Sequence, residues 1–144
     1  MRVFCDTSVL VAASVETHEH HVRAFAVVER VAHGLDDGFI AAHSLAETYA
    51  VLTRLPISPR IHSTEAARII AANIEAFFKT QVLNARDYSK VVHDAAAAGL
   101  TGGAIYDALL LACAAKAAVE RIYTFDLADF RRIAPGLAKI MASP

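Results

Sequence analysis

The sequence has little of what marks several large classes of protein. It has two cysteines, Cys5 and Cys113, and both lie in apolar runs. This placement favours small core residues in a reducing compartment over a disulfide framework. No run of about 18 uncharged apolar residues exists, because the best candidate, residues 104–119, contains two charged side chains. Asp6 interrupts the N-terminal apolar run, so no signal peptide is evident. We therefore expect a soluble, cytoplasmic protein without a membrane partner.

An excess of positive charge is also missing. Lys and Arg number 14 against 15 Asp and Glu, which leaves a net charge of −1. That balance argues against a protein that coats polyanions through bulk charge, although it is compatible with a local basic groove. The chain has 144 residues, 56% of them hydrophobic, and no internal repeat or linker is evident. We expect a single domain, residues 1–144, with a full core.

The apolar runs predict strands that alternate with helices. Strands are expected at residues 3–5, 38–42, 80–83 and 121–125, with an edge strand at 138–141. Helices are expected at residues 8–13, 20–32, 44–54, 64–78, 84–99, 104–119 and 129–133. Asn84, with Asp87 three places on, is typical of a helix N-cap. The alternation predicts an α/β fold, in three layers, with a central, mainly parallel sheet of about four to five strands and helices on both faces.

Four acidic residues fall at what should be one edge of this sheet. Asp6 and Asp126 follow strands, while Glu47 and Asp107 lie in or near the first turn of a helix. In a parallel sheet these positions all lie at the carboxyl edge of the strands. Carboxylates brought that close repel one another, and a divalent cation removes the conflict. Mg²⁺ and Mn²⁺ prefer such oxygen ligands, so the pattern predicts a metal site.

Each acid also has a purely structural interpretation. Ser44 and Glu47 form a capping-box pattern, which by itself favours a helix start over a metal site. Asp6, Asp107 and Asp126 can likewise be helix-start acids stabilised by free N–H groups. Asp107 fits this reading least, because its neighbours are almost all apolar and a buried charge needs a partner. Asp129 is a better capping candidate than Asp126, and we place it outside the ligand set.

Four short motifs resemble a known family when they are taken in order. They are Val3-Phe4-Cys5-Asp6-Thr7-Ser8, Ala46-Glu47, Tyr106-Asp107-Ala108, and Tyr123-Thr124-Phe125-Asp126 followed by Asp129-Phe130. Together they resemble PIN-domain ribonucleases, and more closely the VapC-type toxins of bacterial toxin–antitoxin systems. The resemblance spans nearly the whole chain. One departure is Ala42-His43-Ser44 before the glutamate, where such proteins often have a proline.

This resemblance implies an activity and its partners. It implies a Mg²⁺- or Mn²⁺-dependent endoribonuclease that hydrolyses RNA phosphodiester bonds and so inhibits translation and growth. Asp6, Glu47, Asp107 and Asp126 would be both the metal ligands and the catalytic residues. It further implies a homodimer, and an antitoxin protein that binds across the active-site groove.

Other polar residues are expected near the acids. The hydroxyls of Thr7, Ser8 and Thr124 could hold the ligating carboxylates in place, and Asp129 would lie just outside them. For His18, His20 and His21 a surface loop is a better interpretation than a zinc site, because their spacing fits zinc poorly. His43 is expected in a loop near the acids. Basic residues that could contact RNA are scattered: Arg54, Arg60, Lys79, Arg86, Arg131 and Arg132.

Two other functions remain open from the sequence. One is a catalytically silent PIN-like module that binds RNA or protein, which the presence of all four acids argues against. The other is a Mg²⁺-dependent phosphatase or phosphotransferase with Asp6 as the nucleophile. Such enzymes commonly need a second acid two residues on, where this chain has Ser8. A phospho-accepting signalling domain is disfavoured too, since residues 80–83 contain no acid.

Overall fold

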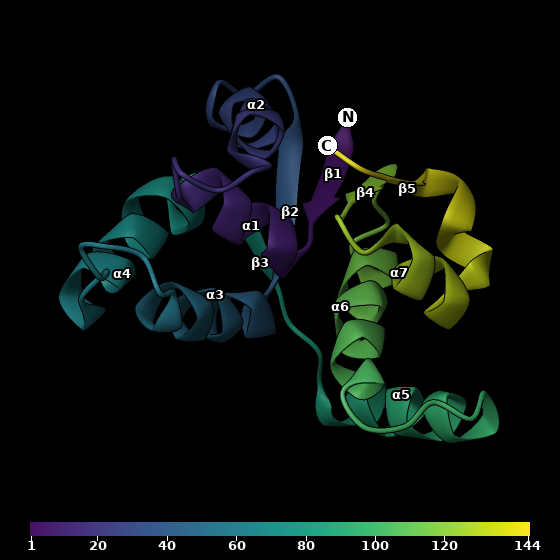
Figure 1. Ribbon diagram of the computed structural model, residues 1–144. Helices are drawn as coiled ribbons and strands as arrows, with labels where there is room; N and C mark the ends of the chain where they lie inside the picture. The colour runs from purple at the N-terminus through teal and green to yellow at the C-terminus, as the bar shows by residue number, and fades with distance from the viewer.

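One five-stranded sheet, parallel throughout, runs through the centre of the protein (Figure 1). The structure is a computed structural model that describes residues 1–144. The strand order is β3-β2-β1-β4-β5, so the N-terminal strand is central. The strand bounds are β1 Arg2–Cys5, β2 Asp37–Ala41, β3 Lys79–Gln81, β4 Arg121–Tyr123 and β5 Met141–Ala142. The predicted α/β fold, with a parallel sheet between two helical layers, is confirmed.

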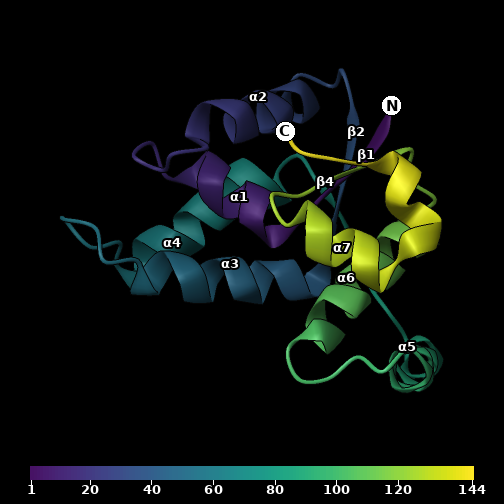
Figure 2. The same ribbon diagram turned by 45° about the vertical axis from the view of Figure 1, so that its right-hand side comes forward.

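Helices cover both faces of the sheet (Figure 1). On one face lie α1 Thr7–Ser14, α2 His21–Ala32, α3 Ala42–Arg54 and α4 Ser63–Ile70, which continues as the π-helical turn η1 Ala71–Glu75. On the other face lie α6 Ala104–Lys116, α7 Leu127–Ile133 and the 3₁₀ helix η2 Pro135–Ile140. Helix α5 Ala85–Ala97 packs against α6, away from the sheet (Figures 1 and 2). None of these helices is long and apolar enough to cross a membrane.

The alternation of side chains along β1 divides the core in two. Val3 and Cys5 belong to a cluster of 16 buried residues that packs under α1, α2, α3 and α4. Phe4 points the other way, into a cluster of 12 buried residues that includes Leu110 of α6 and Phe130 of α7. All three β1 side chains are fully buried, as expected for a central parallel strand covered on both faces. This burial anchors the strand that ends at Asp6.

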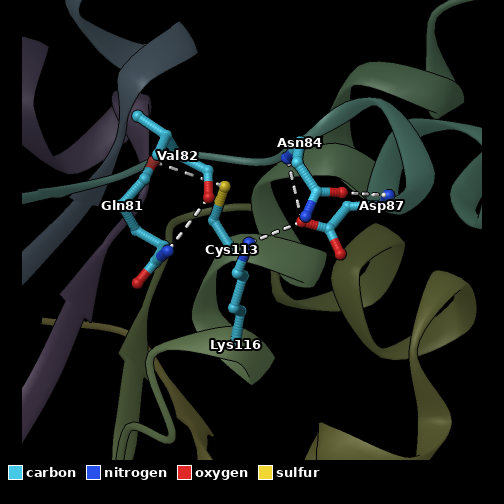
Figure 3. A network of polar contacts seen from close by, with 6 residues as sticks. All are labelled: Gln81, Val82, Asn84, Asp87, Cys113 and Lys116. Carbon is cyan, nitrogen blue, oxygen red and sulfur yellow. Dashed lines mark hydrogen bonds and ion pairs between the residues drawn. The ribbon is translucent and has the colours of Figure 1, made fainter.

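The connection from β3 to α5 is held against α6 by a small polar network (Figure 3). Asn84 and Asp87 form the predicted cap, with each side chain accepting the other residue's backbone N–H at 2.9 Å. Lys116 of α6 donates to Asp87 at 2.6 Å, and the Cys113 thiol donates to the carbonyl oxygen of Gln81 at 3.7 Å. Both cysteines are free and buried, as predicted, and burial raises the pKa of Cys113 to about 11.

Three predicted elements differ from the observed ones in more than a shift of their bounds by a few residues. The helix expected at residues 64–78 is α-helical only to Ile70, and its π-helical turn buries Phe78 while leaving Phe77 45% exposed. The edge strand expected at 138–141 is mostly 3₁₀ helix, with only Met141–Ala142 paired to β4. The helix expected to reach residue 119 ends at Lys116, and Ala118 adopts a positive φ of 49°.

Candidate active site

Asp6 lies at the carboxyl end of the central strand and is nearly inaccessible to solvent. Its residue is 4% exposed, and although it occupies the N-cap position of α1, its side chain makes no capping bond. Ser8 Oγ and Thr124 Oγ1 both donate to Asp6 Oδ2, at 2.7 and 2.9 Å. Burial raises the pKa of Asp6, while these two hydroxyl bonds act in the opposite direction. The backbone N–H of Thr7, at the start of α1, also acts to lower this pKa. Asp6 is therefore an oriented, buried carboxyl group without a cationic partner, and a helix-start role alone does not account for its contacts with Ser8 and Thr124.

The hydroxyls that hold Asp6 are themselves held by the turn after β4. The backbone N–H of Asp126 donates to Thr124 Oγ1 at 3.0 Å, and that of Phe125 donates to Ser8 Oγ at 3.3 Å. Thr124 is fully buried. Each hydroxyl thus accepts from the turn and donates to Asp6, which ties the ends of the two neighbouring strands together. Ser8 and Thr124 therefore lie where the sequence places them, beside the first acid.

Glu47 does not take part in a capping box, so that prediction is wrong. Helix α3 already begins at Ala42, which puts Ser44 inside the first turn and Glu47 beyond the range of the cap. Ser44 is fully buried, and Thr7 Oγ1 lies 3.1 Å from its Oγ and 3.0 Å from Glu47 Oε2. The glutamate side chain is directed toward the start of α1, and hence toward Asp6, by a hydroxyl 40 residues away in the sequence.

Asp107 and Asp126 complete the group of acids. Asp107 lies in the first turn of α6, and its pKa is raised to about 6 by burial and then by the charges of Asp6, Glu47 and Asp126. Asp126 is at the N-cap position of α7 but makes no side-chain capping bond. Asp6, Glu47, Asp107 and Asp126 all line one cleft, so the four acids share one electrostatic environment.

Asp129 lies outside this group. It does not cap α7, contrary to our expectation, because that helix begins at Leu127 with Asp126 before it. Its side chain is 63% exposed and forms an ion pair with Arg132 at 3.4 Å. Its charge contributes to the raised pKa of Asp107, but less than those of the other three acids.

A cleft of about 400 Å³ opens over the four acids. Its lining also includes Thr7, Ser8, Glu19, Phe125 and the histidines His18 and His20. No lysine or arginine lines it, so none of the scattered basic residues named from the sequence lies in the cleft. The cleft is thus lined by five acidic side chains and two histidines, without a lysine or arginine.

This donor set fits Mg²⁺ or Mn²⁺ better than a closed metal cage. No group of three His, Cys, Asp or Glu side chains is close enough to enclose an ion. Such closed cages are typical of structural zinc, whereas Mg²⁺ keeps several waters and needs only one or two direct carboxylates. The buried Asp6, without a cationic side chain beside it, and the raised pKa of Asp107 are both features that a bound cation would relieve.

The histidines take up different positions. His18 and His20 lie in the turn before α2 and line the cleft, while His21 is the first residue of α2 and its Nδ1 lies 3.0 Å from the carbonyl oxygen of Ala12. His43 is in the first turn of α3, not in the expected loop, with Nε2 3.8 Å from Glu47 Oε2. The turn position expected for His18 and His20 agrees with the structure.

Two aromatic contacts beside the acids were not foreseen from the sequence. His20 stacks on Phe125 with ring centroids 4.4 Å apart, and His43 stacks on Tyr106 at 5.5 Å. The only sequence signal is that Phe125 and Tyr106 each directly precede one of the four acids.

Comparisons with known proteins find relatives over most of the chain. The model of the PIN domain family matches residues 3–135. Ribonuclease VapC27 of Mycobacterium tuberculosis is 39% identical over 115 residues, which cover 80% of this chain and 78% of that protein. Ribonuclease VapC40 of the same species is 39% identical over 126 residues, or 85% of this chain and 84% of that protein.

Two solved structures share the fold at lower identity. The crystal structure of M. tuberculosis VapC20, described as a toxin that cleaves the sarcin–ricin loop, has a TM-score of 0.68 and 18% identity, covering 93% of this chain and 94% of that one. The VapBC2 complex of Rickettsia felis, bound to a DNA fragment from its promoter, has a TM-score of 0.67 and 17% identity, covering 99% and 98%.

Proposed function

Since this chain belongs to the PIN domain family, as a VapC-type ribonuclease toxin, we propose that it hydrolyses RNA phosphodiester bonds with Mg²⁺ or Mn²⁺ held by Asp6, Glu47, Asp107 and Asp126. It is an endoribonuclease of a toxin–antitoxin pair, so cleavage of its RNA target would inhibit translation and growth. The single observation that supports the metal site is the cleft itself, which gathers the four carboxylates and no lysine or arginine.

Each acid has a distinct part in this proposal. Asp6 and Asp107 are the main ligands, because Asp6 is buried and oriented and Asp107 carries the raised pKa. Glu47 and Asp126 hold waters or orient the nucleophile. A divalent cation, when bound, supplies polarisation of the phosphoryl oxygens and acidifies water at neutral pH. Ser8, Thr124 and Thr7 keep the carboxylates in position through the hydrogen bonds described above.

The alternatives receive less support. A phosphatase with Asp6 as nucleophile would need a second acid two residues on, but Ser8 at that position is already used to hold Asp6. A catalytically silent module has no use for a cleft in which burial, and then the neighbouring acids, raise the pKa of Asp107 to about 6. Such an arrangement opposes the stability of the metal-free fold and is typical of functional sites.

The remaining partners are proposals as well. We place the protein in the cytoplasm with an RNA substrate, and we expect an antitoxin that inserts a basic side chain among the acids of the cleft. We also propose that the chain forms a homodimer.

The test is RNA cleavage by purified protein with Mg²⁺, with Mn²⁺ and with EDTA. Cleavage should require the metal, and Asp6→Asn and Asp107→Asn should each abolish it without loss of the fold. Asp94→Asn is the matched control, because Asp94 is an exposed acid of α5 that pairs only with Lys90. Cleavage that persists in EDTA, or in both site variants, would refute the proposal.

The antitoxin is tested separately, by the genes beside this one. A small neighbouring gene should encode a DNA-binding protein that copurifies with this chain and suppresses its cleavage of RNA. Lack of inhibition by such a protein would count against the toxin–antitoxin pairing and leave the metal chemistry untouched.

A further inference from the structure

Tyr106 presents an exposed aromatic ring directly beside the acids. It precedes Asp107 in the first turn of α6, and it is 53% exposed. Its ring stacks on that of His43, with an interplanar angle of only 4° and centroids 5.5 Å apart. His43 in turn lies one helical turn before Glu47 and within 3.8 Å of its carboxylate. The two parallel rings therefore form an aromatic stack next to Glu47 and Asp107, two of the four proposed ligands.

Packing does not account for this ring. Its aromatic contact is with His43 alone, and no cationic side chain lies over it. Phe125, the other aromatic residue that precedes an acid, differs in this respect. His20 stacks on Phe125 at 4.4 Å, and the Arg23 guanidinium lies 5.4 Å from its ring centroid. Phe125 is thus covered by its own chain, whereas Tyr106 leaves much of its ring surface open to a ligand.

RNA binding at the acidic cleft requires contacts other than basic side chains, and an exposed aromatic ring can supply one. Because no lysine or arginine lines the cleft, side-chain charge there cannot hold an RNA backbone. Base–aromatic stacking supplies affinity without charge, and enzymes that act on single-stranded or looped RNA commonly hold splayed bases in this way. Tyr106 and His43 do not line the cleft itself, but His43 lies 3.8 Å from Glu47, which does, and stacks on Tyr106. A base adjoining a phosphate in the cleft would meet the ring at this border.

We propose that Tyr106, which stacks on His43, is the stacking site for an unpaired nucleobase next to the scissile phosphate. This inference rests on the proposed ribonuclease function and adds to it a residue that positions the RNA through an unpaired base. The base lies parallel to the Tyr106 ring and extends the stack formed by His43 and Tyr106. Stacking of this kind tolerates any base, so Tyr106 is a substrate-positioning residue that raises affinity more than it selects sequence.

The experiment compares variants that keep or remove the ring. Cleavage sites are first mapped on a long in vitro transcript, and a single-stranded oligoribonucleotide spanning one site is then cleaved with Mg²⁺ under single-turnover conditions. Tyr106→Leu should raise the protein concentration needed for half-maximal rate about 5- to 150-fold, with the maximal rate changed far less. Tyr106→Phe keeps the aromatic face and should stay within about twofold of the parent protein.

Two further arms separate stacking from general damage. Tyr88→Leu removes an equally exposed tyrosine on α5, 46% exposed, and should have no effect. The same oligonucleotide with 2-aminopurine beside the scissile bond is bound to Asp6→Asn protein, which does not cleave. The 2-aminopurine fluorescence should be quenched when the oligonucleotide binds the Asp6→Asn variant. It should not be quenched by the double variant that carries both Asp6→Asn and Tyr106→Leu.

The outcomes distinguish the two proposals. If the parent protein shows no metal-dependent cleavage, the proposed function fails. If the parent protein cleaves in Mg²⁺ but Tyr106→Leu and Tyr106→Phe behave alike, the nucleobase-stacking site alone is refuted. The same holds if the quenching does not depend on Tyr106. A loss confined to Tyr106→Leu, in both cleavage and quenching, supports it.

Discussion

Replacing Asp107 with Asn should stabilise the metal-free protein while it abolishes cleavage. In the folded chain the pKa of Asp107 is raised from 3.8 to about 6, first by burial and then by neighbouring carboxylates. An acid with a raised pKa favours folding only while it is protonated, and its ionisation opposes folding. Stability is therefore present below pH 4 and is lost as the pH rises through about 6. Asparagine keeps the shape of the side chain but cannot ionise.

The size of the effect follows from the pKa difference. A difference of about two pH units corresponds to about 3 kcal/mol at neutral pH. Because Asp107 is only partly buried, solvent screening reduces this to about 1–2 kcal/mol. Roughly half of the gain should already be present at pH 5, between the unfolded and folded pKa values.

Urea unfolding in EDTA, at pH 5 and pH 7.5, measures this difference. Asp107→Asn should exceed the parent protein in free energy of unfolding at both values, and by more at pH 7.5. Asp94→Asn, the surface control, should not, because Asp94 loses only its exposed pair with Lys90. Addition of Mg²⁺ should stabilise the parent protein and have less effect on Asp107→Asn. A less stable Asp107→Asn at pH 7.5 would refute the view of the cleft as an uncompensated group of acids.

Three other changes test separate parts of the structure. Thr124→Val removes a hydroxyl donor to Asp6 and should reduce cleavage about 10- to 100-fold, whereas Thr124→Ser should largely restore it in the same assay. Asp36→Asn loses a 2.6 Å ion pair with Arg30, which holds the pKa of Asp36 below its usual range. The substitution should lower the free energy of unfolding by about 1.5–3 kcal/mol above pH 4 and leave cleavage unchanged. The loss of stability should fade as the pH falls, because Asp36 then becomes protonated in the parent protein. Gly38→Ala should lower the free energy of unfolding by about 1–3 kcal/mol, measured in urea, because a Cβ at this position would lie 2.5 Å from the Val31 side chain.

The elements that the sequence predicted well are those with strong local signals. The apolar run before Asp6 predicts a buried strand whose carboxyl end carries an acid, and the Asn84–Asp87 cap is found as predicted. The Ser44–Glu47 pattern failed for a local reason as well. A capping box needs the helix to begin at the serine, but β2 runs into α3 two residues earlier. Short motifs specify a bond only when the bounds of the element are known.

What the sequence by itself determined is the order of strands and helices and the four acids that follow them, because apolar periodicity and helix punctuation are local properties. The tertiary structure alone decided what each acid contacts. Thr124 donates to Asp6 across 118 residues, and Thr7 meets Glu47 across 40. The pairing of His43 with Tyr106 likewise joins two helices on opposite faces of the sheet. Such contacts depend on the parallel register of β1 with its neighbours, which packing sets and no local pattern encodes.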